Sequence, residues 1–216
     1  MVSDDDFALA IDAGPDFRQQ MLRAGVKKLD AILLTHEHND HVIGLDEVRP
    51  FNFRQRMNMP VYGAVHVLSE VKSRFAYIFD SNPYPGSPKI DLLPISAHHP
   101  FKIGPLEVRP IEVMHGDWPV LGFRFADFTY ITDMKTISEA ELEKVKGTRH
   151  LVLNALQQSQ HYSHLTLEEA LAIIRRIQPE HAYLTHISHS MGLHAEVSRM
   201  LPPNVSLAWD GLEIWC

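Results

Sequence analysis

The chain has 216 residues, a formal net charge of −7 and 14 histidines. That length suffices for one domain with a substantial core, and a hydrophobic content of 45% is ordinary for a globular protein. The excess of acidic residues argues against a protein that grips long nucleic acid through a broad basic face, but it leaves room for a small phosphorylated substrate. The number of histidines is unusually high. It points toward a metal site, because imidazole is the commonest metal ligand in proteins.

The sequence predicts a single domain, residues 1–216, in the cytoplasm. No apolar run reaches the roughly 20 residues of a membrane helix, and the N-terminal residues 1–6 are acidic where a signal peptide would be basic. The only cysteine is Cys216, so neither an internal disulfide nor an all-cysteine zinc site can form within one chain.

Strands are expected to alternate with helices along the chain. Apolar or alternating runs predict strands at residues 7–11, 31–34, 60–62, 106–113, 121–125, 128–132, 150–154 and 182–185. Helices are expected from Gly14 to about Ala24, from a Thr166 cap to about Ile177, and at residues 193–200. A terminal hairpin is expected from residues 205–207 and 212–215, and residues 80–88 form a long exposed loop.

Four candidate metal ligands follow the strand at residues 31–34. His36 and His38 lie two residues apart, so an extended loop directs both rings to one side, while Asp40 and His41 lie past the bend and can serve a second ion. The alternative is a polar loop whose histidines are coincidental. Four potential ligands in this order make a metal site the better interpretation.

Further ligands are expected at the ends of other strands. His115, Asp133 and His186 each follow an apolar run, although any one of them alone is more often an ordinary loop residue. Together with the first loop they provide ligands for two ions. One ion would be bound by His36, His38 and His115, and the other by Asp40, His41 and His186. Asp133 would lie between the two ions. Nitrogen and oxygen ligands of this kind suit two divalent ions such as Zn²⁺ or Mn²⁺.

These motifs resemble those of the metallo-β-lactamase superfamily. Asp12 after the first strand, the His-x-His-x-Asp-His loop and the three later ligands resemble its five successive motifs, from Phe7 to the C-terminus. Residues 12–18, 184–189 and 210–214 are similar to the cyclic phosphodiesterase branch, which includes the phosphoribosyl cyclic phosphodiesterase. The resemblance implies an α/β fold, the αββα sandwich, with Asp12 orienting the ligand loop and Asp133 bridging the metals.

His164, just before the capped helix, resembles a histidine that the phosphodiesterase branches place beside the metals. That resemblance implies a proton donor or a phosphate clamp. The alternative is a surface histidine near a helix N-terminus, where the helix dipole does not favour protonation. Neighbouring His161 is interpreted as a surface residue.

The N-terminus departs from the family pattern. Members usually begin with an additional strand and a glycine-rich turn, often followed by cysteines, whereas this chain starts almost on the strand that ends at Asp12. In the cyclic phosphodiesterase branch those cysteines hold a structural zinc with a histidine placed as His189 is here. Without them, His189 is not expected to belong to an intact structural site.

The predicted function is hydrolysis of a small cyclic or linear phosphodiester by a hydroxide that bridges two metal ions. Asp40 and Asp133 would orient the hydroxide, and His164 would stabilise or protonate the departing alkoxide. The same site could hydrolyse a lactone, thioester or β-lactam, and a metal-binding protein without turnover is the third alternative. A homodimer, as in relatives, is left open.

Overall fold

The computed structural model describes residues 1–3 and 7–215. Residues 4–6 of the acidic N-terminus and Cys216 lie outside the described residues. The chain divides into two compact units, the first formed by residues 1–96 and 103–105 and the second by residues 97–102 and 106–216. The single-domain assignment therefore stays a prediction. Among the described residues, no helix is both long enough and apolar enough to cross a membrane.

The first unit contains a five-stranded sheet in the order β1-β2-β3-β4-β5. The strands are β1 (Val2–Ser3), β2 (Ala8–Ile11), β3 (Ala31–Leu33), β4 (Met59–Gly63) and β5 (Ile90–Pro94). β1 is antiparallel to β2, and the other neighbouring strands are parallel. The sequence predicted no strand before residue 7, so the short edge strand β1 is a difference from that expectation.

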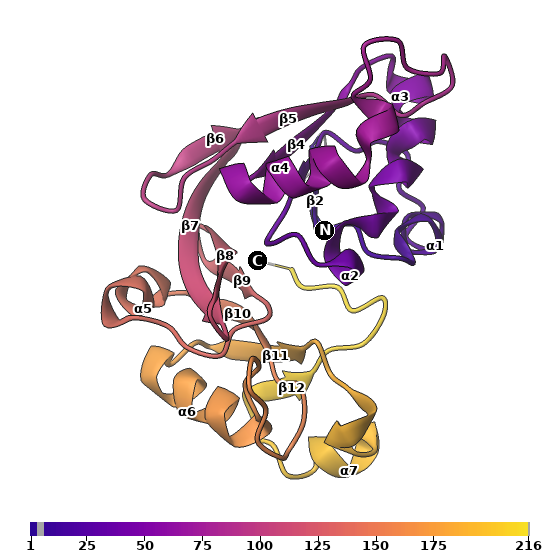
Figure 1. Ribbon diagram of the computed structural model, residues 1–216. Coiled ribbons are helices and arrows are strands. Elements are labelled where there is room, and N and C mark those ends of the chain that lie inside the picture. Colours follow the sequence, from indigo (N-terminus) through magenta and orange to yellow (C-terminus); the bar gives the residue numbers. More distant parts are fainter. Residues whose placement is uncertain (4–6, 216) are drawn as a thin grey trace. The chain divides into compact units, whose positions relative to one another are not determined.

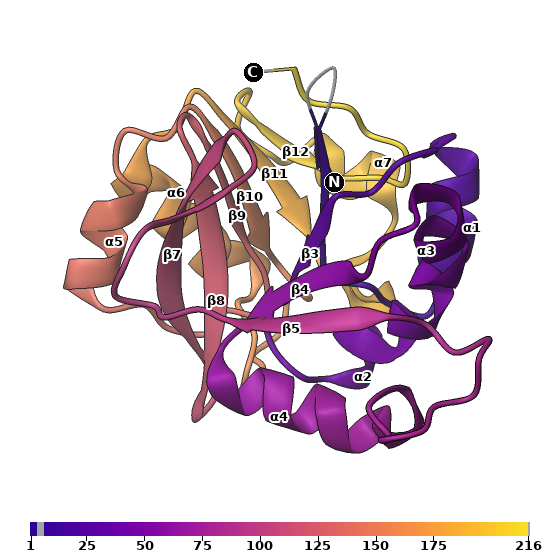
Figure 2. The ribbon, with the colours of Figure 1, turned by 90° about the horizontal axis from the view of Figure 1, so that it is seen from above.

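Helices bury the apolar face of this sheet, as Figure 2 shows for α1, α3 and α4 beside β3, β4 and β5. The helices are α1 (Phe17–Arg23), α2 (Asn39–Val42), α3 (Arg49–Gln55) and α4 (Val65–Arg74), with 3-10 turns η1 (Ile43–Val48) and η2 (Ala76–Ile78). Phe17, Phe51 and Val67 from three helices share one apolar core with Ile32 and Val61 of the sheet. Burial of such side chains stabilises the unit by about 1.5–3 kcal/mol each.

The second unit contains a seven-stranded sheet in the order β12-β11-β10-β9-β8-β7-β6. The strands are β6 (Phe101–Ile103), β7 (Leu106–His115), β8 (Trp118–Phe125), β9 (Phe128–Ile131), β10 (His150–Asn154), β11 (His181–Thr185) and β12 (Val205–Leu207). β7, β8 and β9 are joined antiparallel, whereas β9 to β12 run parallel. The carboxyl ends of β9, β10 and β11 therefore meet at one edge, where side chains from the following loops can converge.

Two helices of this unit, α5 (Glu139–Val145) and α6 (Leu167–Ile177), cover the same face of the sheet (Figure 1). Leu142 of α5 and Ile174 of α6 belong to one core with Leu151 and Leu153 of β10. The remaining helical segments are η3 (His189–Met191) and α7 (His194–Ser198). Every residue of β10 is buried, as expected for a central strand packed on both faces.

Most expected elements are confirmed, with boundaries that shift by one to three residues. The predicted terminal hairpin is wrong: residues 212–215 form no strand, and β12 instead pairs in parallel with β11. No residue of 212–215 is buried, so pairing them would bury no apolar face. The strands β5 and β6 and the helices α2, α3, α4 and α5 were not predicted, because their apolar residues are few and are interrupted by polar or charged ones.

The start of α6 tests one local signal. Thr166 accepts a hydrogen bond from Glu169 N, and Glu169 Oε2 accepts one from Thr166 N, which forms the predicted capping box. We expect Thr166→Ala to lower the free energy of unfolding by about 1 kcal/mol in urea denaturation, and Thr166→Ser to retain it. An equal loss in both variants would contradict the capping role.

Candidate metal centre

The first unit gathers three histidine rings in the loop after β3. The His36 and His38 ring centroids lie 4.6 Å apart, and those of His36 and His41 lie 4.2 Å apart. Asp40 Oδ2 lies 3.4 Å from His41 Nε2. The structure thus brings together the four side chains that the sequence proposed for this loop.

Asp12 holds this loop in place. It follows β2 with a φ of 60°, and its carboxylate accepts hydrogen bonds from Thr35 N and Thr35 Oγ1, both at 2.8 Å. His41 Nδ1 lies 2.7 Å from Asp12 Oδ2. A carboxylate at Nδ1 fixes the ring orientation and directs Nε2 away from Asp12, the arrangement typical of metal-binding histidines.

Two glycines, Gly14 and Gly44, allow the backbone of the ligand loop to pack directly against the backbone of the turn after β2. A Cβ on Gly44 would lie 2.1 Å from the Gly14 carbonyl oxygen, and a Cβ on Gly14 would lie 2.5 Å from the Asp40 carbonyl oxygen. Real Cβ atoms do not come so close to backbone, so any side chain would push these segments apart. The turn after β2 and the ligand loop are therefore in direct backbone contact.

The second unit gathers four side chains from the ends of different elements. His115 ends β7, Asp133 follows β9, His164 precedes α6 and His186 follows β11. His186 Nε2 and His164 Nδ1 lie 3.3 Å and 3.7 Å from Asp133 Oδ1, and the His115 and His164 rings are 4.5 Å apart. His115, Asp133 and His164 each offer one ligand atom within 4.8 Å of the others.

The backbone at two of these residues is left-handed. Asp133 and His186 both have a φ of 54°, which is uncommon for residues other than glycine and recurs at functional sites. Each turns the chain sharply at the end of a strand. His115 Nδ1 lies 2.9 Å from the carbonyl oxygen of Ser163, which fixes the ring of His115 as Asp12 fixes that of His41.

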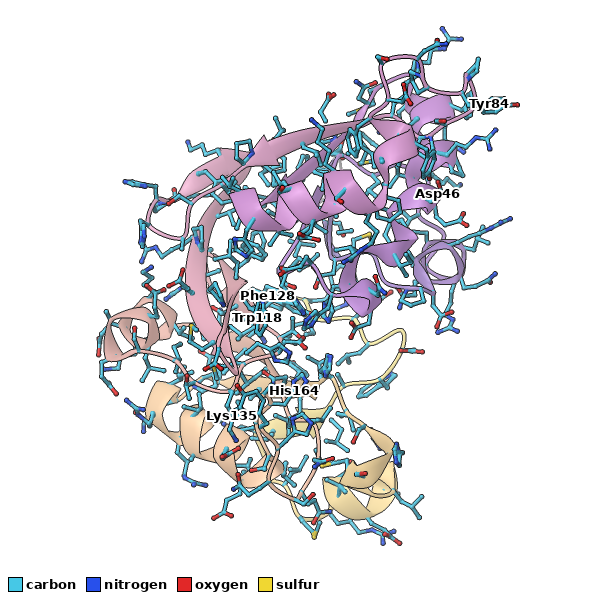
Figure 3. All side chains as sticks on the ribbon, viewed as in Figure 1. Asp46, Tyr84, Trp118, Phe128, Lys135 and His164 are labelled. Atoms are coloured by element: carbon cyan, nitrogen blue, oxygen red, sulfur yellow. The ribbon has the colours of Figure 1, made fainter. Side chains whose placement is uncertain are left out.

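His164, labelled in Figure 3, has a strongly lowered pKa. Burial lowers its pKa to about 4; the Asp133 carboxylate opposes that shift, and the rings of His186, His115 and His161 reinforce it. The Nδ1 atom of His164 is buried and has no hydrogen-bond partner among the described residues. A neutral imidazole with a buried, unsatisfied nitrogen fits a site that takes a metal ion or a substrate atom.

The structure adds to the predicted set in two places. It groups His164 with His115 and Asp133 as candidate ligands, and it places the His161 ring 5.0 Å from that of His164, although the sequence had indicated a surface role. His189 begins η3 and is exposed. The distribution of ligands between two ions, with some from each unit, stays a prediction.

Comparison with known proteins identifies the family. The family model described as "Beta-lactamase superfamily domain" matches residues 8–187. The chain belongs to the metallo-β-lactamase superfamily. The α/β fold predicted from the motifs is confirmed, with two mixed sheets flanked by helices.

Particular relatives point to different activities. The chain is 34% identical to a diphosphatase of the PhnP family whose crystal structure superimposes with a TM-score of 0.91, over 99% of this chain and 82% of that one. It is 41% identical over 214 residues to an octanoyltransferase of Porphyromonas gingivalis, and 28% identical over 121 residues to a ribonuclease Z of Bradyrhizobium sp.. It spans only 43% and 40% of the lengths of these last two proteins.

Asn154 supports the second-unit cluster through hydrogen bonds to the main chain next to Asp133. Its amide accepts a hydrogen bond from Met134 N at 2.8 Å and donates one to Met134 O at 2.9 Å, and the same carbonyl accepts from Leu165 N. Met134 follows Asp133 in the chain, and Leu165 follows His164. Asn154 is fully buried, so its loss would leave Met134 N without its hydrogen-bond partner and remove one of the two hydrogen bonds to Met134 O.

We expect Asn154→Ala to lower the affinity for Zn²⁺ about 10-fold, as measured by competition with a chelating dye, because Asp133 and His164 lose their support. Asn52→Ala is the matched control. Asn52 is also buried and makes three hydrogen bonds to the main chain, in the first unit. The control variant should lose stability but keep the affinity; wild-type affinity in Asn154→Ala would refute the supporting role.

Proposed function

We propose that the chain is a metal-dependent hydrolase that cleaves a small cyclic or linear phosphodiester. The observation that carries the proposal is the cluster around Asp133, in which a buried carboxylate lies within 4 Å of nitrogens of His164 and His186. The likeness to a PhnP-family diphosphatase and to a ribonuclease Z supports phosphorus as the reacting centre. The predicted cytoplasmic location, small phosphorylated substrate and homodimer stay predictions.

Histidine and aspartate side chains would hold the metal ions. We assign this role to His36, His38, Asp40, His41, His115, Asp133 and His186, with Zn²⁺ or Mn²⁺ as the ion. Two such ions, when bound, lower the pKa of water and neutralise charge on the phosphoryl oxygens. Asp40 and Asp133 are the carboxylates that we propose would orient the attacking water through hydrogen bonds.

His164 would act on the departing oxygen. Its lowered pKa means that the ring is neutral at pH 7, so it stabilises the leaving oxygen with an N–H donor rather than with a full positive charge. The buried position keeps competing water away from that contact. This role distinguishes His164 from the ligands proposed above.

A second candidate reaction is hydrolysis of a diphosphate bond. It is favoured by the PhnP-family diphosphatase, which is similar over nearly the whole of this chain. The attack on phosphorus is the same in both reactions, and only the leaving group differs. Cleavage of a diphosphate releases a phosphate, whereas cleavage of a phosphodiester releases an alkoxide. Both stand apart from attack on a carbonyl, as in a lactone, thioester or β-lactam.

A substrate panel tests the reaction class. We expect metal-dependent cleavage of bis-p-nitrophenyl phosphate and adenosine 2′,3′-cyclic phosphate after chelation and return of Zn²⁺ or Mn²⁺, and loss of it in Asp133→Ala. A dinucleoside diphosphate, a lactone and an octanoyl thioester complete the panel. Cleavage of the carbonyl substrates alone would overturn the proposal, and activity on none would indicate a metal-binding protein without turnover.

His164→Ala tests the role of that residue. We expect kcat for the phosphodiester to fall about 100-fold or more, while the content of bound metal stays that of the wild type. Metal content is measured by atomic emission after dialysis. Loss of metal together with activity would show instead that His164 is a ligand. His189→Ala, which changes an exposed histidine of the same unit, is the control and should alter neither quantity.

A further inference from the structure

The hairpin turn after β7 places an exposed aromatic ring beside His115. Gly116 and Asp117 join β7 to β8, and His115 pairs directly with Trp118 across the turn. Directly opposed residues of antiparallel strands point to the same face, with their Cβ atoms about 4.5–5.5 Å apart. Trp118, labelled in Figure 3, is 57% exposed, so its side chain lies at the surface and is paired with a candidate metal ligand across the turn.

A second exposed ring lies over the same turn. Tyr162 is 71% exposed, and its hydroxyl donates a hydrogen bond of 2.6 Å to Asp117 Oδ2, which raises the pKa of the tyrosine. A Cβ added to Gly116, whose φ is 61°, would lie 2.8 Å from Cε1 of Tyr162. The tyrosine ring is therefore held against the turn, and only glycine fits beneath it.

Both rings are tied to the loop that carries the candidate site. The carbonyl oxygen of Ser163, the residue after Tyr162, is the partner of His115 Nδ1, and His164 comes next in the chain. The hydrogen bond to Asp117 and the close contact with Gly116 limit the motion of the Tyr162 ring. The strand pairing with His115 fixes the backbone of Trp118. Rigid aromatic side chains bind with little loss of conformational entropy.

We propose that Trp118 and Tyr162 form an aromatic platform that stacks against the base of a nucleotide-type phosphodiester, an inference that rests on the proposed function. Aromatic rings stack on any base, because every base has a π face. The Asp117 carboxylate within the platform disfavours a second phosphate there, so a neutral base fits better than the terminal phosphate of a phosphorylated sugar.

Two matched substrates test the platform. Adenosine 2′,3′-cyclic phosphate and methyl riboside 2′,3′-cyclic phosphate share the reacting ring and differ in the base. We expect the wild type to prefer the adenosine compound, and Trp118→Ala to reduce the ratio of the two kcat/KM values about 10-fold, mainly through KM. Trp118→Phe, which keeps an aromatic ring, should retain most of the ratio of the two kcat/KM values. Tyr162→Phe should reduce that ratio less than Tyr162→Ala does.

The control is Tyr84→Ala, which removes a tyrosine that is 76% exposed in the first unit (Figure 3) and should leave the ratio unchanged. An unaltered ratio in Trp118→Ala would overturn the platform and leave the proposed function standing. The ratio also stays unaltered if Trp118→Ala lowers kcat/KM equally for both substrates. That outcome would show that the change only disturbs His115, which serves both substrates.

A binding measurement decides the platform even if neither substrate is cleaved. The chain has three tryptophans, so Trp209→Phe with Trp215→Phe leaves Trp118 as the single indole emitter. We expect AMP to quench its fluorescence saturably, ribose 5-phosphate not to do so, and Tyr162→Ala to weaken AMP binding several-fold. Absence of quenching by AMP would overturn the inference, whatever the reaction of the site.

Discussion

The buried carboxylate of Asp133 is the constraint on which the second unit depends. It is 2% exposed, accepts a hydrogen bond from Thr132 Oγ1 at 2.6 Å, and faces imidazole nitrogens on its other side. Burying an ionised carboxylate costs several kcal/mol unless positive charge compensates it. The lowered pKa of His164 favours a neutral ring that supplies a dipole but no full charge, whereas a divalent cation at this cluster would compensate the carboxylate directly. The ends of three strands and the start of α6 are arranged around that one negative charge.

Both units orient a histidine in the same way. Asp12 engages Nδ1 of His41 in the first unit, and the carbonyl oxygen of Ser163 engages Nδ1 of His115 in the second. One partner is a carboxylate and the other is backbone, yet each fixes the ring and leaves Nε2 to point away from the partner. Orientation by a second layer of contacts therefore accompanies the candidate ligands in both halves of the chain.

The sequence indicated which loops carry the candidate ligands because these residues are dense, polar and placed next to apolar strands. Asp12, the His36 loop, Asp133 and His186 follow strands that the structure contains, and His115 is the last residue of another. The capping box of α6 was equally visible, since it is local. The supporting role of Asn154 was not, because it depends on a contact with Met134, 20 residues earlier, and nothing in a buried asparagine's neighbours in the chain reveals its partner.

Other elements escaped prediction for reasons of context. The helix α4 has only three buried residues, Val67, Leu68 and Val71, so its apolar pattern is brief. The expected strand at residues 212–215 has alternating residues but no surface to bury them against. The Trp118 and Tyr162 pair is brought together by the hairpin turn and by the loop before α6, two segments more than 40 residues apart. Local sequence patterns indicate which segments can form strands or helices, and only the fold shows which residues they contact.

The close approach of Gly14 and Gly44 has a consequence for how the first cluster is formed. The loop that carries His36, His38, Asp40 and His41 is locked against the turn after β2 by backbone contact and by the Asp12 carboxylate. Its shape is thus determined by the protein's own packing and does not wait for an ion. An ion that enters would find the rings already assembled, so little of its binding energy would go into ordering the chain.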